Sequence, residues 1–365
     1  MKIRVATLVW RDGYGGAERS VRDLAVALDR DQFDMRFYYL AESPTATFAE
    51  EIASLGYVVQ TLNWHSGLSW AGRRRLLREL CQFDPMIVHD HNIPPLTRPL
   101  VKLVCQCPIL YSEHGIAMRH AAGQDTWRRF VTRFDLLFCD RILANSYASR
   151  KAVEHAYGIS ESKIQVVYLG IDLQRFAPAS DLTTNGRRHR VGFVGRILNK
   201  HKGTDYLPYV AQILCKKGYK DIEFVIVGDG PDRLVVESLC KQTGTDHLFT
   251  FLGFHPDVQS LLGTFDILLI PSRFESFGLS ALEAVAMGVR VVAFDVGGLR
   301  EAVGECDAAC LVPPGNVEAM AQAIADILDS PRTRSRSARA YVEAHFSNQR
   351  MASDLQRVYR EYASK

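Results

Sequence analysis

The sequence predicts an α/β protein with two domains, each a parallel β-sheet with helices on both faces. At 365 residues the chain is longer than one ordinary compact core. Short apolar or β-branched segments alternate with helix-like segments, which is the pattern of a doubly wound parallel sheet. A polar, turn-rich stretch interrupts this alternation, which then begins again. We expect a first domain at 1–172, a linker at 173–188, a second domain at 189–345 and a last helix within 346–365.

Composition excludes several classes of protein. Hydrophobic residues make up 47% and charged residues 23% of the chain, which indicates a globular protein rather than a disordered one. A net charge of +3 gives no electrostatic case for nucleic acid. Residues 1–10 predict a first strand rather than a secretion leader, and no apolar run is long enough for a membrane span. The eight cysteines lack zinc-site spacing, so we expect free thiols and a cytoplasmic protein.

The first half predicts a regular succession of elements. Residues 2–9 predict a strand, residues 10–16 a glycine-rich turn and residues 17–28 a helix. The turn does not have the spacing of a dinucleotide fingerprint, so no nicotinamide cofactor is expected. The alternating segments that follow are 35–40, 47–55, 57–62, 69–81, 86–89, 96–105, 109–112, 141–146, 148–157 and 164–167.

Two of these strands end in polar residues. Ligands of doubly wound sheets bind beyond the carboxyl ends of the strands, so His89, His91 and His114 are candidates there. His89 and His91 are spaced to point the same way from a strand. They are either a metal pair, with no evident further ligands, or structural or acceptor-lining residues.

The second half contains the most informative stretch, residues 271–283. It follows an apolar strand at 265–270 and opens a helix whose first backbone N–H groups suit a phosphate or a sugar oxygen. Gly278 permits close approach of a ligand. Glu275 and Glu283 each supply a carboxylate that accepts hydrogen bonds from a pair of hydroxyls. Together these features predict a nucleotide-sugar site.

This part of the chain resembles a known family. The resemblance is carried by Glu275-x7-Glu283, Met287-Gly288, Val291-Val292-Ala293 and the residues 296–301 (VGGLRE), which together are similar to the core signature of glycosyltransferase family 4. It implies a GT-B fold, with two Rossmann-like domains facing across a cleft and a C-terminal helix that crosses back to the first. It also implies a retaining enzyme with no cofactor and no obligatory metal.

The resemblance also implies roles for individual residues. It assigns catalytic roles to His114, Arg196, Lys202 and Glu275, with the two cations stabilising the departing nucleoside diphosphate. Lys200 is an alternative to Lys202, because the loop is one residue longer than the common pattern. The residues assigned to the nucleotide sugar are Gly15, Gly16, Gly228, Gly230, Leu252, Ser276, Phe277, Gly278, Leu279 and Glu283.

The activity that follows is transfer of a sugar from a nucleotide-diphosphate sugar to an acceptor hydroxyl, most commonly for a bacterial envelope polysaccharide or glycolipid. The acceptor would be a sugar, a lipid-linked molecule or a small molecule. The alternatives are another GT-B enzyme, such as a nucleotide-sugar epimerase, and a non-catalytic nucleotide-sugar-binding subunit.

The role of one basic and aromatic segment, residues 118–134, has two interpretations. Related enzymes with lipid acceptors often place such a surface of the N-terminal domain on anionic membrane. A second basic cluster, Arg73, Arg74, Arg75 and Arg78, lies in the same half. The alternative is a helix with a solvated basic face and a Trp/Phe stripe in the core.

Overall fold

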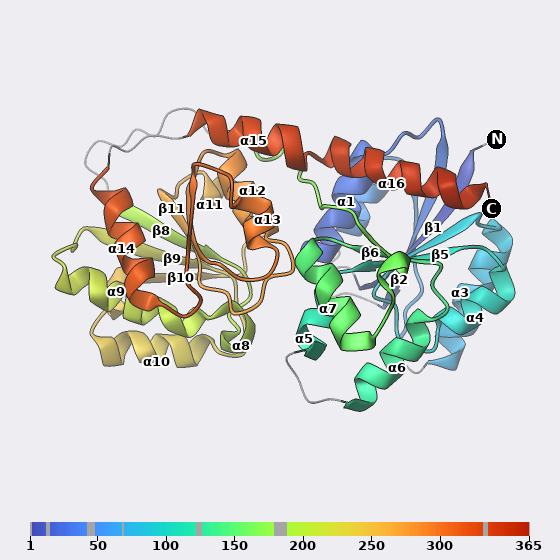
Figure 1. Ribbon diagram of the computed structural model, residues 1–365, viewed down its shortest axis with the longest axis horizontal. Helices are drawn as coiled ribbons and strands as arrows, with labels where there is room; N and C mark the ends of the chain where they lie inside the picture. Colours follow the sequence, from blue (N-terminus) through green and yellow to red (C-terminus); the bar gives the residue numbers. More distant parts are fainter. Residues whose placement is uncertain are drawn as a thin grey trace. The chain divides into compact units, whose positions relative to one another are not determined.

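The computed structural model describes residues 2–11, 15–41, 48–67, 69–121, 126–178, 188–330 and 335–364. The chain forms two compact units, shown in Figure 1. The first unit comprises Met1–Asp172 and Ser347–Lys365, and the second comprises Leu173–Phe346. Of the expected linker, residues 179–187 lie outside the described residues.

The first unit is a seven-stranded sheet in the order β3-β2-β1-β4-β5-β6-β7, with every neighbouring pair parallel. Its strands are β1 (Ile3–Arg11), β2 (Phe33–Ala41), β3 (Val58–Thr61), β4 (Ile87–His91), β5 (Ile109–Glu113), β6 (Arg141–Ala144) and β7 (Ile164–Val166). Its helices are α1 (Gly16–Ala27), α2 (Phe48–Ser54), α3 (Trp70–Phe83), α4 (Arg98–Cys105), α5 (Ile116–Ala121), α6 (Thr126–Leu136), α7 (Tyr147–Tyr157) and α16 (Asn348–Ala363).

Successive residues of these strands enter opposite faces of the sheet, because side chains alternate along a strand. On one face, Ala6 and Leu8 of β1 pack into a core with α3, α4 and α7. On the other face, Val5 and Val9 pack with α1 and α16. Both faces of the sheet are therefore covered, as the alternating sequence pattern predicts.

The C-terminal helix α16 belongs to the first unit, as the resemblance implies. The chain enters it where the backbone N–H of Asn348 donates to the carbonyl of Ile171 at 2.9 Å. Gly170 is needed at this junction, because a Cβ there would lie 2.3 Å from the Ser347 carbonyl oxygen. Met351 and Tyr359 of α16 are then buried among residues of β1, β2 and α1.

The second unit has a six-stranded parallel sheet in the order β10-β9-β8-β11-β12-β13. Its strands are β8 (His189–Val194), β9 (Ile222–Val227), β10 (Phe249–Gly253), β11 (Ile267–Ile270), β12 (Arg290–Phe294) and β13 (Ala309–Val312). Its helices are α8 (Asn199–Lys202), α9 (Leu207–Lys216), α10 (Arg233–Thr243), α11 (Val258–Leu262), α12 (Leu279–Ala286), α13 (Leu299–Val303), α14 (Val317–Leu328) and α15 (Arg336–Phe346).

The strand order places a switch point in each sheet, between β1 and β4 in the first unit and between β8 and β11 in the second. Ligands of doubly wound folds bind beyond the carboxyl ends of the strands at such a point. In the second unit, the loops after β8 and β11 are those that carry Lys202 and Glu275. The strand order therefore predicts a ligand site at the same loops as the sequence analysis does.

Candidate functional site

Helix α12 begins where the sequence analysis places a ligand-binding helix start. All four residues of β11 are buried, and Gly278 follows as the N-cap of α12 with a φ of 114°. An L-residue strongly disfavours this backbone conformation. A Cβ at Gly278 would also lie 2.6 Å from Cδ2 of Leu299. Glycine therefore fixes the entry into the helix and leaves its first N–H groups at the carboxyl end of β11.

An ion pair joins the loops that follow β8 and β11. The Nζ of Lys202 donates to Oε2 of Glu275 at 2.7 Å, and both side chains are largely shielded from solvent. The hydroxyl of Ser272 donates to the same carboxylate oxygen at 3.3 Å. Lys202 rather than Lys200 thus lies beside Glu275, whereas Lys200 is exposed.

A second pair holds the same two loops together. The guanidinium of Arg273 forms a bidentate pair with Asp205, at 2.6 and 2.7 Å, and also donates to the carbonyl of Asn199 at 2.6 Å. It lies over the ring of Tyr206, 4.2 Å from the centroid. The backbone N–H groups of Arg273 and Phe274 both donate to the carbonyl of His201. Sequence reasoning did not assign Arg273 or Asp205 a role, and no local pattern links residues 68 positions apart.

Arg196 is exposed on the loop after β8. The residues on either side of it, Gly195 and Ile197, lie against Gly228 and Gly230 of the loop after β9. A Cβ on Gly228 would lie 2.0 Å from the carbonyl oxygen of Gly195. A Cβ on Gly230 would lie 2.1 Å from the carbonyl oxygen of Ile197. These glycines therefore allow the two loops to pack backbone against backbone, which fixes the loop that carries Arg196.

The other residues assigned to the nucleotide sugar differ in exposure. Ser276, in the loop between β11 and α12, is half-buried, and Leu252, on strand β10, is exposed. Phe277 and Leu279 are buried, and the Phe277 ring packs on Phe346 with centroids 5.6 Å apart. Their contribution to a ligand would come from backbone groups. Glu283 is completely buried inside α12.

In the first unit, three histidines form a stack at the ends of β4 and β5. The Nδ1 of His91 lies 3.0 Å from Nε2 of His114. The rings of His89 and His91 have centroids 4.1 Å apart. His89 is hydrogen-bonded through Nδ1 to the hydroxyl of Tyr359 at 2.6 Å and through Nε2 to the hydroxyl of Ser112 at 2.8 Å.

The surrounding protein keeps these imidazoles neutral. Burial, with a smaller contribution from His114, lowers the pKa of His89 to about 3. Burial lowers the pKa of His114 to about 4. Burial also lowers the pKa of His91 well below its usual value, with smaller contributions from the other two histidines. The described residues contain no group of three or more His, Cys, Asp or Glu side chains that could hold a metal ion.

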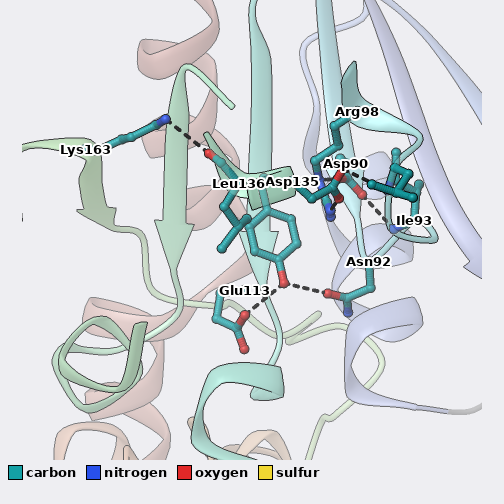
Figure 2. Close-up of polar contacts among 10 residues, drawn as sticks. Asp90, Asn92, Ile93, Arg98, Glu113, Asp135, Leu136 and Lys163 are labelled. Atoms are coloured by element: carbon teal, nitrogen blue, oxygen red, sulfur yellow. Dashed lines mark hydrogen bonds and ion pairs between the residues drawn. The ribbon is translucent and has the colours of Figure 1, made fainter. Parts of the chain in front are cut away.

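Buried polar pairs hold the backbone of β4, β5 and the loops after them, and Figure 2 shows these contacts. Arg98 is paired with Asp90 at 2.5 Å and with Asp135, and Asp90 also accepts from the backbone N–H of Ile93 at 2.9 Å. The hydroxyl of Tyr111 lies 2.8 Å from Oε2 of Glu113 and 3.0 Å from Oδ1 of Asn92.

Gly15 and Gly16 stand at the start of α1, as predicted, with Gly15 as its N-cap. The carbonyl of Gly15 accepts the first hydrogen bond of the helix, from the N–H of Arg19 at 3.1 Å. A Cβ on Gly15 would lie 2.3 Å from Oε2 of Glu18. Residues 12–14 of the same turn lie outside the described residues.

The basic and aromatic segment forms α5 and α6, with residues 122–125 outside the described part of the chain. The Trp/Phe stripe of α6 is exposed, which corrects the alternative that places it in the core. Its exposed apolar side chains are Trp127 at 72%, Phe130 at 62%, Phe134 at 43% and, just beyond the helix, Leu137 at 58%. Arg128 and Arg133 are exposed beside them.

The other basic cluster is smaller than its sequence indicates. Arg73 is buried and donates to the carbonyls of Gly67 and Pro95 at 2.8 and 3.0 Å. Arg74, Arg75 and Arg78 are exposed on α3. Among the described residues, no helix is both long and apolar enough to cross a membrane.

Comparison with known proteins agrees with these features. Residues 14–175 match the family described as Glycosyltransferase Family 4, and residues 188–330 match Glycosyl transferases group 1. The crystal structure of Anabaena Alr3699/HepE in complex with UDP and glucose superposes with a TM-score of 0.81 at 19% identity. The superposition covers 98% of this chain and 99% of that one. This likeness shows the fold, which is the GT-B fold that the resemblance implies.

Two curated relatives are similar in sequence. A 2-deoxystreptamine glucosyltransferase of Streptomyces kanamyceticus is 37% identical over 143 residues, which are 39% of this chain and 36% of that enzyme. The chain thus spans about a third of the length of that relative. A D-inositol 3-phosphate glycosyltransferase of Corynebacterium efficiens is 30% identical over 287 residues, which are 72% of this chain and 68% of that enzyme. Since this second match extends over more than two thirds of both proteins, the chain belongs to glycosyltransferase family 4.

Proposed function

We propose that this protein is a retaining glycosyltransferase that moves a sugar from a nucleoside-diphosphate sugar to an acceptor hydroxyl. The observation that carries the proposal is the Lys202–Glu275 ion pair beside the start of α12. It brings together a cation suited to a diphosphate, a carboxylate suited to sugar hydroxyls and a helix start suited to phosphate. The names of the relatives support transfer of a sugar as the reaction.

In this proposal, the second unit binds the donor. Arg196, Lys202 and the N–H groups at the start of α12 contact the diphosphate. The loop of Gly228 and Gly230, which packs backbone against backbone on the Arg196 loop, lies beside the nucleoside. Fixed cations stabilise the negative charge that develops on the leaving group, so no obligatory metal is needed. Glu275 accepts hydrogen bonds from the donor sugar. Glu283 accepts them from the ribose diol, which requires that nucleotide binding exposes its carboxylate, because its side chain is completely buried in this structure.

The departing diphosphate leaves from the face of the sugar that the acceptor attacks, which retains the configuration of the anomeric carbon. The first unit supplies His114, which contacts the donor sugar or orients the acceptor hydroxyl, and Gly15 and Gly16, whose backbone approaches the phosphates. The imidazole of His114 is neutral at pH 7, because burial lowers its pKa to about 4. It is therefore suited to hydrogen bonding rather than to charge neutralisation.

The first experiment is a thermal-shift screen of nucleoside diphosphates and their sugars, without and with magnesium. We expect one base to stabilise the protein without metal, by about 2.7 kcal/mol at a hundredfold excess over the dissociation constant. No shift with any nucleotide would contradict the donor site. A requirement for magnesium would contradict the metal-independent mechanism.

The second experiment compares Glu275→Ala with the control Glu305→Ala, which removes an exposed carboxylate in the same unit. We expect the Glu275 variant to bind the nucleoside diphosphate but to lose most sugar transfer, whereas the Glu305 variant behaves as wild type. Undiminished transfer by Glu275→Ala would refute the assignment. Product analysis distinguishes a transferase from an epimerase, because an epimerase changes the donor without any acceptor.

We further propose that the acceptor is a bacterial envelope polysaccharide or glycolipid and that α6 contacts the anionic surface of the membrane. Trp127, Phe130 and Phe134 form an exposed apolar stripe flanked by the exposed cations Arg128 and Arg133. Such a helix inserts aromatic side chains at the headgroup level while its cations meet anionic lipid. All eight cysteines are free thiols, which supports a cytoplasmic location.

Vesicle flotation tests this contact. Wild-type protein should float with vesicles containing anionic lipid and not with neutral ones, and the double variant Trp127→Ala/Phe130→Ala should stay at the bottom. Leu234→Ala is the control, because Leu234 is 77% exposed in the second unit. Equal recovery of wild type and double variant with anionic vesicles would exclude α6 as the contact.

A further inference from the structure

His91 and His114 share a single hydrogen bond between two ring nitrogens. The Nδ1 of His91 lies 3.0 Å from the Nε2 of His114, and the rings stack with centroids 5.2 Å apart and planes at 24°. A neutral imidazole carries one hydrogen, so one ring must donate in this contact and the other must accept. Burial lowers the pKa of both rings, so both are neutral at pH 7. The contact therefore links the tautomer of His114 to that of His91.

The burial of His91 indicates which ring donates. Its other nitrogen, Nε2, is buried and has no hydrogen-bond partner among the residues that the structure describes. A buried N–H without a partner is rarer than a buried acceptor without one. The hydrogen of His91 is therefore better placed on Nδ1, where it is donated to Nε2 of His114. His114 then carries its own hydrogen on Nδ1.

We propose that His91 is a positioning residue that fixes His114 as the Nδ1–H tautomer, so that His114 presents an N–H donor to a substrate oxygen. This inference rests on the proposed role of His114 in sugar transfer. His91 itself is 5% exposed and acts through His114.

Three elements hold the stack in place. His89 and His91 come from β4, His114 follows β5, and Tyr359 comes from α16. Because both nitrogens of His89 are hydrogen-bonded, its ring has a fixed orientation against which the His91 ring packs. The neighbouring Glu113 carboxylate accepts from the Tyr111 hydroxyl and from the N–H of Ala117 at 3.0 Å. These two contacts hold the Glu113 carboxylate in place.

A small cavity adjoins the stack. Its space for the centre of a water-sized sphere is about 20 Å³, which is room for one water molecule. Its lining combines polar side chains of the first unit, including His91, His114, Ser112 and Asn145, with apolar ones such as Leu143 and Met351. A water molecule that accepted from Nε2 of His91 would reverse donor and acceptor in the His91–His114 contact and place the hydrogen of His114 on Nε2, and the tautomer measurement below tests for that outcome.

Kinetics of three variants test the positioning role. His91→Asn keeps an amide group near the position of Nδ1, His91→Gln moves the amide toward the position of Nε2, and His91→Leu removes both groups. We expect the His91→Asn variant to retain most of kcat. The kcat of the Gln and Leu variants should fall by about 100-fold, which is the usual effect of a small misplacement of a reacting group. The KM for the nucleotide sugar should change little, because the proposed donor contacts of Arg196, Lys202 and Glu275 lie in the second unit.

The control is His155→Asn, which changes an exposed histidine of α7. Thermal unfolding and nucleoside-diphosphate affinity of every variant check that the protein is folded. Equal kcat values for the Asn, Gln and Leu variants would overturn the positioning role.

The tautomer itself is measurable without any sugar transfer. The ¹⁵N chemical shifts of labelled histidine distinguish Nδ1–H from Nε2–H imidazole, and loss of a signal in His114→Gln assigns the His114 ring. We expect Nδ1–H in wild type and a changed or mixed tautomer in His91→Gln. An Nε2–H tautomer of His114 in wild type would overturn the inference. A wild-type protein with the Nδ1–H tautomer but no transfer would instead overturn the proposed function.

Discussion

The Nζ of Lys202 lies 2.7 Å from Oε2 of Glu275, so an ion pair spans 73 positions of sequence and joins the loops after β8 and β11. The pair is largely shielded from water. Charge–charge interactions are stronger in such a shielded position than at the exposed surface. A bound diphosphate would compete with Glu275 for the ammonium group. The two side chains are therefore expected to act together in donor binding and in departure of the leaving group.

Removal of the Lys202 charge should strongly reduce kcat/KM for the nucleotide sugar. For Lys202→Met we expect kcat/KM to fall by about 10² to 10³, the usual scale for loss of one stabilising group at a developing negative charge. Lys200→Met is the matched control, since Lys200 is exposed in the same short helix, and it should change kcat/KM by less than about twofold. Steady-state kinetics with saturating acceptor measure both, and a larger effect at Lys200 would reverse the assignment.

Loss of the Arg273–Asp205 pair should loosen both donor loops. Arg273→Ala removes three hydrogen bonds from a charged donor and is expected to destabilise the second unit by about 1.5–3 kcal/mol. Nucleoside-diphosphate affinity, measured by calorimetry, should fall as well. Arg188→Ala removes an exposed and longer pair with Asp221, at 3.6 Å, and should leave both quantities unchanged. Unaltered affinity of the Arg273 variant would show that the pair has no part in donor binding.

The buried histidines should make the first unit less stable in mild acid. The pKa of His89 is lowered to about 3 and that of His114 to about 4, so the unfolded chain binds more protons than the folded one below pH 6.5. The stabilisation from each neutral histidine is complete above pH 6.5 and is lost as the pH falls toward the folded pKa. At pH 5 the loss is about 2 kcal/mol for each such histidine.

Fluorescence-detected unfolding measures this effect, because all four tryptophans, at positions 10, 64, 70 and 127, belong to the first unit. The unfolding free energy of His89→Gln should fall less between pH 7 and pH 5 than that of wild type. Burial also raises the pKa of Asp90 and of Asp135. The contribution of these carboxyl groups to the unfolding free energy therefore increases, rather than decreases, as the pH falls. That contribution is common to both proteins and cancels in the difference. Equal pH dependence of wild type and variant would contradict the prediction.

Tyr359 should contribute to the stability of the first unit through His89. Tyr359→Phe leaves Nδ1 of a completely buried histidine without its 2.6 Å partner, at an expected cost of about 1–3 kcal/mol. Tyr147→Phe, at a 53% exposed tyrosine of α7, should cost less than about 0.5 kcal/mol. Urea unfolding followed by tryptophan fluorescence compares the two, and equal effects would show that the buried hydroxyl contributes nothing specific.

Much of the fold could be predicted from local sequence. The apolar segments at 35–40, 57–62 and 109–112 lie within one or two residues of β2, β3 and β5, because strand formation follows from short apolar runs bounded by turns. Strand β10 begins only at Phe249, because Asp246–Leu248 forms a 3-10 turn before it. Such shifts at element ends depend on backbone hydrogen bonds that composition does not specify.

Exposure was harder to predict. The run of arginines on α3 gives no sign that Arg73 is buried with two carbonyl partners, since the arginines that follow it, Arg74 and Arg75, are exposed. The aromatic residues of α6 fit a core stripe equally well in sequence, yet Trp127 and Phe130 are exposed. Whether an amphipathic stripe faces the core depends on what packs against it, which is a tertiary property.

The sequence by itself determined the two α/β sheets, the glycines at the loop starts and the charged residues of the donor loops. Each of these features can be predicted from residues that are close together in the sequence. Only the tertiary structure decided that Lys202 meets Glu275, that Arg273 meets Asp205 and that His91 meets His114. Each of these pairs joins side chains from separate loops or strands. Their distance depends on strand order, register and packing, and the periodicity of a single segment carries no information about them.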